Sequence, residues 1–199
     1  MSSEVEICNL ALSHVSASAR IESLTENSNE AYYCNLHFQT ARDAMLEAMD
    51  WGFARRYVTL ADLGTPPADW SYRYAYPQDC VSARSLHNST DRQKGYPFEV
   101  AALVESETIT GRVILCDIDG AELRYTARVT TPGVFSASFV TGLSWQLAYN
   151  IAKPLTGSNQ ERDAAGQGLA LFMAQAQVAD ANQSREQVSP ESTWVTGRA

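Results

Sequence analysis

The stretch EAYYCNLHFQTARDAMLEAMDWGFARR (residues 30–56) decides how the rest of the chain is interpreted. Its apolar residues recur at spacings of three and four, which predicts the buried stripe of one long helix. Asn27 and Ser28 precede the stripe as candidate N-caps, Asn27 with Glu30 makes an approximate capping box, and Gly52 follows as a stop. The predicted core residues of this region are Cys34, Phe38, Met45, Trp51 and Phe53.

The same stretch contains a candidate metal-binding or catalytic pair. Cys34 and His37 are three residues apart, a spacing that a metal site or a cysteine nucleophile with its base can use. No second pair at ligand spacing occurs elsewhere, and spacing alone shows no group that lowers the pKa of the cysteine. The apolar stripe accounts for Cys34 without a site, so we expect a helix that builds the fold and no enzyme. The alternative is a small cytosolic hydrolase that uses Cys34 and His37, or acidic residues of the later β region.

Length and composition bound the class of protein. A chain of 199 residues with 45% hydrophobic residues can bury a sizeable core without a disulfide or a metal. The net charge of −8 argues against a protein that grips nucleic acid by its phosphates, although nucleic acid can still slide past such a surface. The four cysteines are far apart, the start lacks the features of a signal peptide, and no apolar run is long enough to span a bilayer. We therefore expect reduced core thiols in a cytosolic protein with no cofactor.

The pattern along the chain predicts two helices, a group of short strands and two further helices. The helices are expected over residues 4–15, 31–49, 139–151 and 160–181, with Lys153-Pro154 ending the third. Strands are expected over residues 70–76, 81–86, 98–104, 113–117 and 123–129, with a polar loop over 89–95. Asp119-Gly120 predicts a tight hairpin between the last two strands. Asp117 and Asp119 lack the further ligands of a calcium loop.

These elements predict a mixed α+β fold: an antiparallel α-helical bundle with an inserted antiparallel β domain and an extended C-terminal tail. Small residues in the last helix would let neighbouring helices approach closely. The GLSW sequence at 142–145 is no nucleophile elbow, since Gln146 replaces the second glycine. The predicted boundaries are 1–56 for the N-terminal helices, 57–134 for the β domain, 135–182 for the C-terminal helices and 183–199 for the tail.

The tail is polar and without periodicity, yet it contains a tryptophan. Two interpretations stay open: a frayed terminus, or a segment that docks on a partner with Trp194 as its anchor. Under the second interpretation, the residues that contact a portal protein or a neighbouring subunit are Val188, Pro190, Trp194, Val195 and Arg198.

The N-terminal region resembles the head-to-tail adaptor proteins of tailed bacteriophages. This group comprises the tail tubular protein A family of short-tailed phages and its tail accessory and head-completion relatives. The likeness rests on order and spacing over about the first 85 residues, and Asp50 departs from it, because relatives often have proline there. The matching segments are ICNLAL (7–12), SLTENSNEA (23–31), CNLHFQTARDAML (34–46), WGFARR (51–56) and DWSYRYAYPQDCV (69–81).

The resemblance implies a structural virion protein without catalytic, cofactor or metal residues. Members of this family form a twelve-fold ring beneath the portal protein in the virion neck, and the ring is made and assembled in the cytoplasm of the bacterial host. The helical part faces the portal, C-terminal segments reach along it, and a tail nozzle, tail tube or fibre protein attaches below. Double-stranded DNA would pass through the lumen without specific binding, which an acidic lumen favours. No membrane contact is implied.

Overall fold

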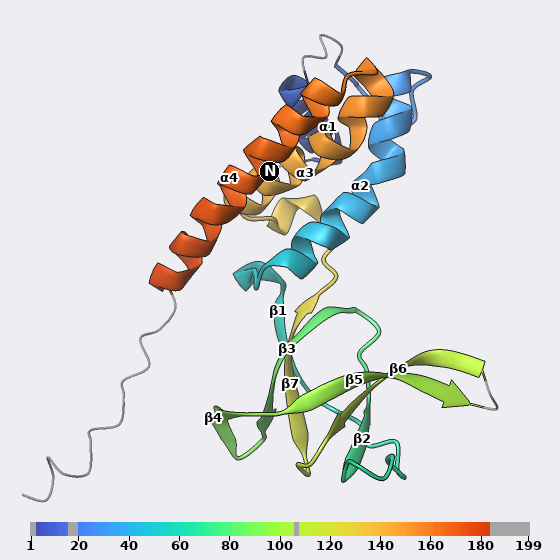
Figure 1. Ribbon diagram of the computed structural model, residues 1–199, viewed down its shortest axis with the longest axis vertical. Coiled ribbons are helices and arrows are strands. Elements are labelled where there is room, and N and C mark those ends of the chain that lie inside the picture. Colours follow the sequence, from blue (N-terminus) through green and yellow to red (C-terminus); the bar gives the residue numbers. More distant parts are fainter. Residues whose placement is uncertain (1–2, 16–19, 106–107, 184–199) are drawn as a thin grey trace, which may run out of the picture.

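A layer of helices lies against one end of a curled β region in the computed structural model (Figure 1), which describes residues 3–15, 20–105 and 108–183. The helices are α1 (Glu4–His14), α2 (Asn29–Ala48), α3 (Ala137–Thr156) and α4 (Asn159–Gln183), with short 3-10 helices η1 (Gly52–Ala54) and η2 (Pro132–Val134). The strands are β1 (Arg55–Thr59), β2 (Tyr72–Ala75), β3 (Cys80–Asn88), β4 (Asp91–Tyr96), β5 (Phe98–Glu105), β6 (Thr108–Cys116) and β7 (Ala121–Ala127).

Helix α2 forms where the apolar stripe predicts it. Ser28 is the N-cap, and its hydroxyl accepts a hydrogen bond from the backbone N–H of Ala31 at 3.2 Å. The helix ends at Ala48, and the Trp51 indole then turns back to donate a 2.6 Å hydrogen bond to the Met45 carbonyl. Of the predicted core residues, the structure buries Cys34, Phe38, Met45 and Trp51 and partly buries Phe53.

Helix α3 is the centre of the helical layer, because α1, α2 and α4 each pack mainly against it. Its buried residues Phe139, Leu143, Leu147 and Ile151 recur every four positions, as expected from the sequence. The helix does not stop at Lys153-Pro154: it includes Pro154 in its last turn, although proline removes one backbone N–H from the helical hydrogen bonds there. It ends instead at Gly157, which adopts a left-handed conformation with φ of 69° and donates to the Lys153 carbonyl.

Two glycines let the helices of this layer touch. A Cβ atom on Gly168 of α4 would lie 2.6 Å from the Trp145 ring of α3. A Cβ atom on Gly142 of α3 would lie 2.5 Å from both the Met45 and the Phe172 side chains. The expected close approach at small residues is therefore confirmed.

The strands form two antiparallel sheets, in the orders β1-β7-β3-β4 and β2-β6-β5. An isolated bridge pairs Asp62, in the loop after β1, with Tyr74 of β2, and together the sheets curl into a half-barrel. A second apolar core fills the space between them. Its members include Tyr74, Leu86, Ile114, Leu123 and Tyr125.

The strand prediction needs three corrections. The polar loop expected over 89–95 is wrong, because residues 91–96 form the edge strand β4, and the short strand β1 was not expected. Asp119-Gly120 forms a turn with Gly120 at φ of 64°, but it makes no hairpin. The reason is that β6 and β7 belong to different sheets, so this turn carries the chain from one sheet to the other.

The predicted fold class is correct only as a mixed α+β fold; the four-helix bundle with an inserted β domain is wrong. The helices do not surround one shared four-sided core, because three of them pack on the central α3 and α4 has little other contact. Strands make up about 28% of the structure and curl into a half-barrel. This sheet structure is also fastened directly to the end of α2, as described below.

The contact at Gly168 predicts the sign of a stability change. Gly168→Ala should destabilise the protein, because the rigid Trp145 ring must move, and this outweighs the roughly 1 kcal/mol that alanine gains over glycine in a helix. Gly166→Ala is the matched control, since its Cβ would meet Tyr149 at 3.3 Å, and this ring needs to give by only a few tenths of an ångström. Urea unfolding of both variants checks this order, and equal or reversed stabilities would contradict the close contact.

Candidate functional site

The structure does not assemble Cys34 and His37 into a pair. The Cys34 side chain is fully buried, as is the side chain of Cys8 on α1. His37 is partly exposed, and no hydrogen bond joins it to Cys34 within the described residues. The Cys34 side chain and burial together raise the pKa of the Cys8 thiol, which keeps this sulfur protonated rather than nucleophilic.

The acidic residues of the β region have structural partners. One carboxylate oxygen of Asp117 accepts hydrogen bonds from both the backbone N–H and the hydroxyl of Ser71, each at 3.0 Å. The Glu122 carboxylate accepts two hydrogen bonds from the Arg92 guanidinium, at 2.6 and 2.7 Å. Across the described residues, no group of three or more His, Cys, Asp or Glu side chains is arranged to hold a metal ion.

A serine–histidine contact that the sequence did not reveal lies between α1 and α3. His14 stacks on Trp145 with ring centroids 3.7 Å apart, and its Nε2 lies 3.1 Å from the Ser144 hydroxyl. That hydroxyl donates its proton to the Thr141 carbonyl at 2.8 Å, so the imidazole donates to the serine oxygen rather than activating it. Ser144 is buried, which makes this a packing contact between helices.

Burial lowers the pKa of His14 below its ordinary value of about 6.5. The unfolded chain therefore takes up this proton at higher pH than the folded chain does. The contribution of neutral His14 to stability is present above about pH 6.5 and is lost as the pH falls below it. His14→Gln should accordingly lose less stability than the natural protein between pH 7.5 and pH 5 in urea titrations. Parallel pH profiles of the two proteins would contradict this account.

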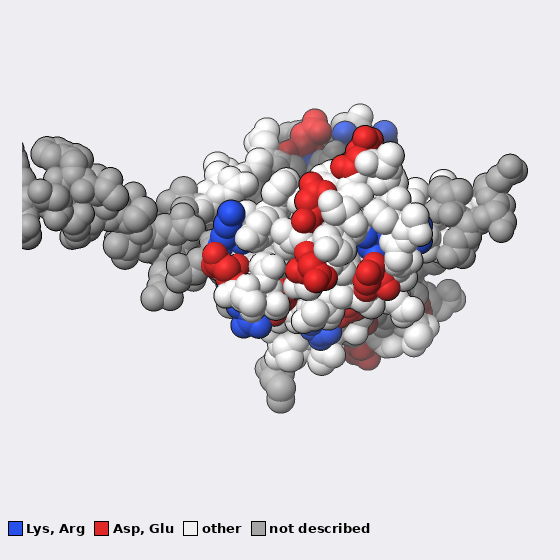
Figure 2. Space-filling view, turned by 90° about the horizontal axis from the view of Figure 1, so that it is seen from below, with Lys and Arg blue, Asp and Glu red and all other residues white. Residues whose placement is uncertain are grey.

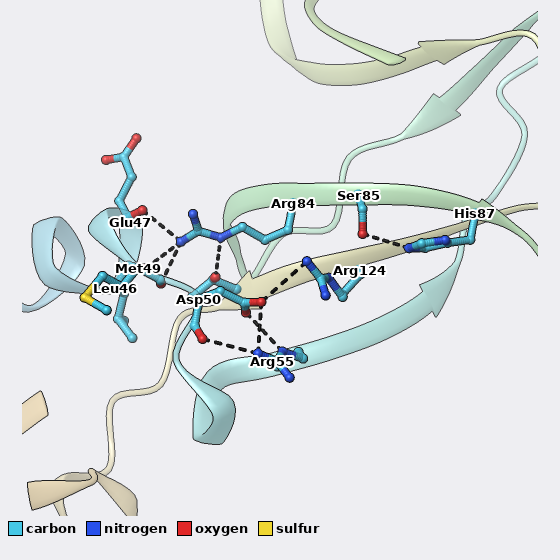
Figure 3. Close-up of polar contacts among 10 residues, drawn as sticks. Leu46, Glu47, Met49, Asp50, Arg55, Arg84, Ser85, His87 and Arg124 are labelled. Carbon is cyan, nitrogen blue, oxygen red and sulfur yellow. Dashed lines mark hydrogen bonds and ion pairs between the residues drawn. The ribbon is translucent and has the colours of Figure 1, made fainter. Parts of the chain in front are cut away.

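A guanidinium group joins the end of α2 to the first sheet (Figure 3). Nη2 of Arg84, on β3, donates to the carbonyls of Leu46, Glu47 and Met49 at 3.1, 2.8 and 2.7 Å. Its Nε donates to the Thr126 hydroxyl on β7 at 2.9 Å. The last carbonyls of a helix have no partners within the helix, so Arg84 supplies the cap that the sequence of α2 lacks.

Two aspartates, Asp50 and Asp43, extend this connection. We call these aspartates, their arginine partners and Arg84 the junction. Asp50 pairs with Arg55 of β1 and with Arg124 of β7, at 3.0 and 3.5 Å (Figure 3). On the side of α2, Asp43 pairs at 2.8 Å with Arg42, whose side chain is only 7% exposed, and at 3.0 Å with Arg128. The junction fixes the orientation of the sheet relative to the helical layer.

Removing the Arg84 guanidinium should destabilise the folded protein. Arg84→Met keeps the length of the side chain but leaves the carbonyls at the end of α2 without their donor, so we expect a loss of about 2 kcal/mol. Arg56→Met is the control, because Arg56 is 57% exposed and its ion pair with Asp79 lies at the surface. Chemical unfolding compares the two, and a loss of under about 0.5 kcal/mol for Arg84→Met would show that the junction is dispensable.

A hairpin of β5 and β6 projects away from the rest of the molecule (Figure 1). β2 pairs with β6 only from Val113 to Cys116, whereas β5 pairs with β6 along its whole length. The described residues 102–105 and 108–112, which we call the outer hairpin, therefore have no third strand beside them. Ile109 in this segment is 71% exposed.

Such an arrangement is unfavourable for an isolated molecule. A two-stranded ribbon without further cover is marginally stable in water, and unpaired strand edges invite pairing with another chain. The inner end of the outer hairpin is held by Arg112, which stacks on Tyr76 at 4.1 Å and donates to the Cys80 carbonyl. This end is thus anchored, and the outer part is left without a covering strand.

The end of the molecule farthest from the helices is acidic. Viewed from that end, Asp and Glu side chains are spread over the centre of the face, and Lys and Arg lie mostly toward its rim (Figure 2). The loop before β2 and the turn between β6 and β7 meet at this end through the contact of Ser71 with Asp117. The exposed acidic residues of these two segments are Asp62, Asp69, Asp117 and Asp119.

The remaining expected contact residues, Val188, Pro190, Trp194, Val195 and Arg198, lie outside the described residues. None of the helices in the described part of the chain is long and apolar enough to cross a membrane. Comparison with protein-family models finds no match, and no curated protein matches the chain either.

Proposed function

We propose that this chain is a structural subunit of the head-to-tail adaptor of a tailed bacteriophage. In this proposal, copies of the chain, expected to number twelve, form a ring beneath the portal protein in the virion neck. The ring gives DNA a channel and gives the tail a platform for attachment. The resemblance of residues 6–81 to the adaptor family supports the proposal from the sequence.

The outer hairpin is the observation that carries the proposal. It extends beyond its own third strand and exposes apolar surface, so it suits a subunit whose edges are completed by its neighbours. A contact between the hairpin of one copy and a different surface of the next is heterologous, and repeated heterologous contacts close into a ring when the rotation permits.

Two surfaces support the proposed partners. Tyr32 and Leu36 are 61% and 55% exposed and lie one turn apart on the outer face of α2, which makes an apolar surface for a protein partner such as the portal. The acidic end of the β region would repel the phosphates of passing DNA, as a channel that must not bind its cargo requires.

The test places a charge on the outer hairpin. Ile109→Asp should leave the folded monomer intact, because this side chain is 71% exposed, but it should abolish assembly into rings on purified portal complexes. Sedimentation and negative-stain electron microscopy of the mixture measure ring formation, and circular dichroism confirms that the variant is folded.

Val134→Asp is the matched control for this test. Val134 is 54% exposed in η2, so the same change in charge is made outside the hairpin and should leave assembly unchanged. Normal ring formation by Ile109→Asp would remove the hairpin from the proposal. If the natural protein stayed monomeric and did not bind portal, a monomeric binding module would replace the adaptor.

A further inference from the structure

A second serine–histidine contact lies on β3 (Figure 3). Ser85 and His87 are two residues apart on this strand, so their side chains lie on one face of the sheet, while the buried Leu86 between them lies on the other. The Ser85 Oγ atom is 2.7 Å from Nε2 of His87. Both side chains are partly exposed, whereas Ser144 is buried, so Ser85 can meet a molecule from solution.

The second ring nitrogen fixes the direction of this hydrogen bond. Nδ1 of His87 lies 3.2 Å from the backbone carbonyl of Lys94 on β4. A carbonyl oxygen can only accept, so the neutral ring carries its proton on Nδ1 and leaves Nε2 as an acceptor. The Ser85 hydroxyl then donates to Nε2, which is the arrangement in which a histidine acts as the base of a serine nucleophile. The contact of His14 with Ser144 runs in the opposite direction.

A carbonyl, and not a carboxylate, orients this histidine. Glu122 of β7 is the cross-strand partner of His87, but each of its carboxylate oxygens accepts a hydrogen bond from Arg92, at 2.6 and 2.7 Å. A neutral carbonyl holds the ring in place but stabilises the imidazolium less than a carboxylate does. The pair therefore suits esters whose leaving group departs easily, rather than amides.

An unused N–H group lies on the neighbouring strand. Arg124 of β7 is directly opposite Ser85 in the strand register, so the two side chains share a face of the sheet. Its Nη2 atom pairs with Asp50 at 3.5 Å, whereas its Nε atom is shielded from solvent and has no hydrogen-bond partner among the described residues. Buried donors without a partner are rare, and this one is available to an oxyanion formed beside Ser85.

We propose that Ser85 and His87 are a catalytic pair for the cleavage of small activated esters. The Ser85 Oγ atom attacks the acyl carbon while Nε2 of His87 takes the hydroxyl proton. The bond from the acyl carbon to the leaving oxygen breaks, and His87 gives the proton to the departing alcohol, which leaves an acylated Ser85. Water then attacks the acyl group with His87 as the base, and the carboxylic acid and the free serine are released. This inference does not depend on the proposed adaptor function.

The experiment treats the full chain with a fluorophosphonate probe and, separately, with p-nitrophenyl acetate. We expect one phosphonyl group per chain, located on Ser85 by mass spectrometry of the tryptic peptide of residues 85–92. With the ester, a rapid release of one p-nitrophenolate per chain should precede slower turnover, because a serine is acylated first. Ser144 should stay unlabelled, because it is buried and its hydroxyl donates to a backbone carbonyl.

Variants separate this chemistry from general acylation of the surface. Ser85→Ala should remove both the label and the rapid release, and His87→Gln should slow labelling by about 100-fold, because the base is lost. Ser82→Ala is the matched control, since Ser82 is a partly exposed serine on the same strand, and its loss should change neither result.

Circular dichroism checks that each variant is folded. If a variant does not fold, the position of the label in the natural protein still decides. An unlabelled natural protein, a label on a residue other than Ser85, or equal labelling rates for His87→Gln and the natural protein would overturn the proposal.

Discussion

The unsatisfied carbonyl groups at the end of α2 constrain the rest of the structure. The helix has no glycine cap: Met49 is extended there, with φ of −140°, so the last carbonyls need donors from elsewhere. Arg84 supplies them from β3, while its Nε reaches β7. The hydrogen bonds of Arg84 to these carbonyls therefore position the sheet relative to α2. Because the junction sets this orientation, it also sets where the acidic end and the outer hairpin lie relative to the helical layer.

The molecule divides its proposed tasks between its two ends. The helical layer presents apolar side chains on α2, and the β region carries acidic turns and a hairpin that its own sheet does not complete. An assembly subunit needs these properties, since it must bind neighbours on several sides while leaving a surface that DNA does not bind. Ser144 and Cys34, the candidate nucleophiles of the helical layer, are both buried, and the Ser144 hydroxyl donates to the Thr141 carbonyl, so neither is placed to reach a substrate.

The elements that could be predicted from the sequence are those determined by the local spacing of apolar residues. The stripe of α2 and the four-residue repeat of α3 recur at fixed spacing, so both helices could be located in advance. β4 escaped prediction because it is a polar edge strand with Arg92 and Lys94, which is how natural sheets protect an edge. The contacts of Arg84 with α2 and of His14 with Ser144 join residues far apart in the chain, and no spacing rule reveals them. The bundle prediction failed for the same reason, since the order of elements does not show which helix is central.

The most direct test of the account is hydrogen exchange of the backbone amides of residues 102–105 and 108–112, measured in the free protein and in the protein assembled with portal. The account predicts rapid exchange of the outer hairpin in the free protein, slower exchange of the three-stranded part from Val113 to Cys116, and strong protection of the outer hairpin after assembly. An outer hairpin that is already protected in the free protein, or that stays unprotected in the assembled ring, would contradict the claim that a neighbouring copy completes it.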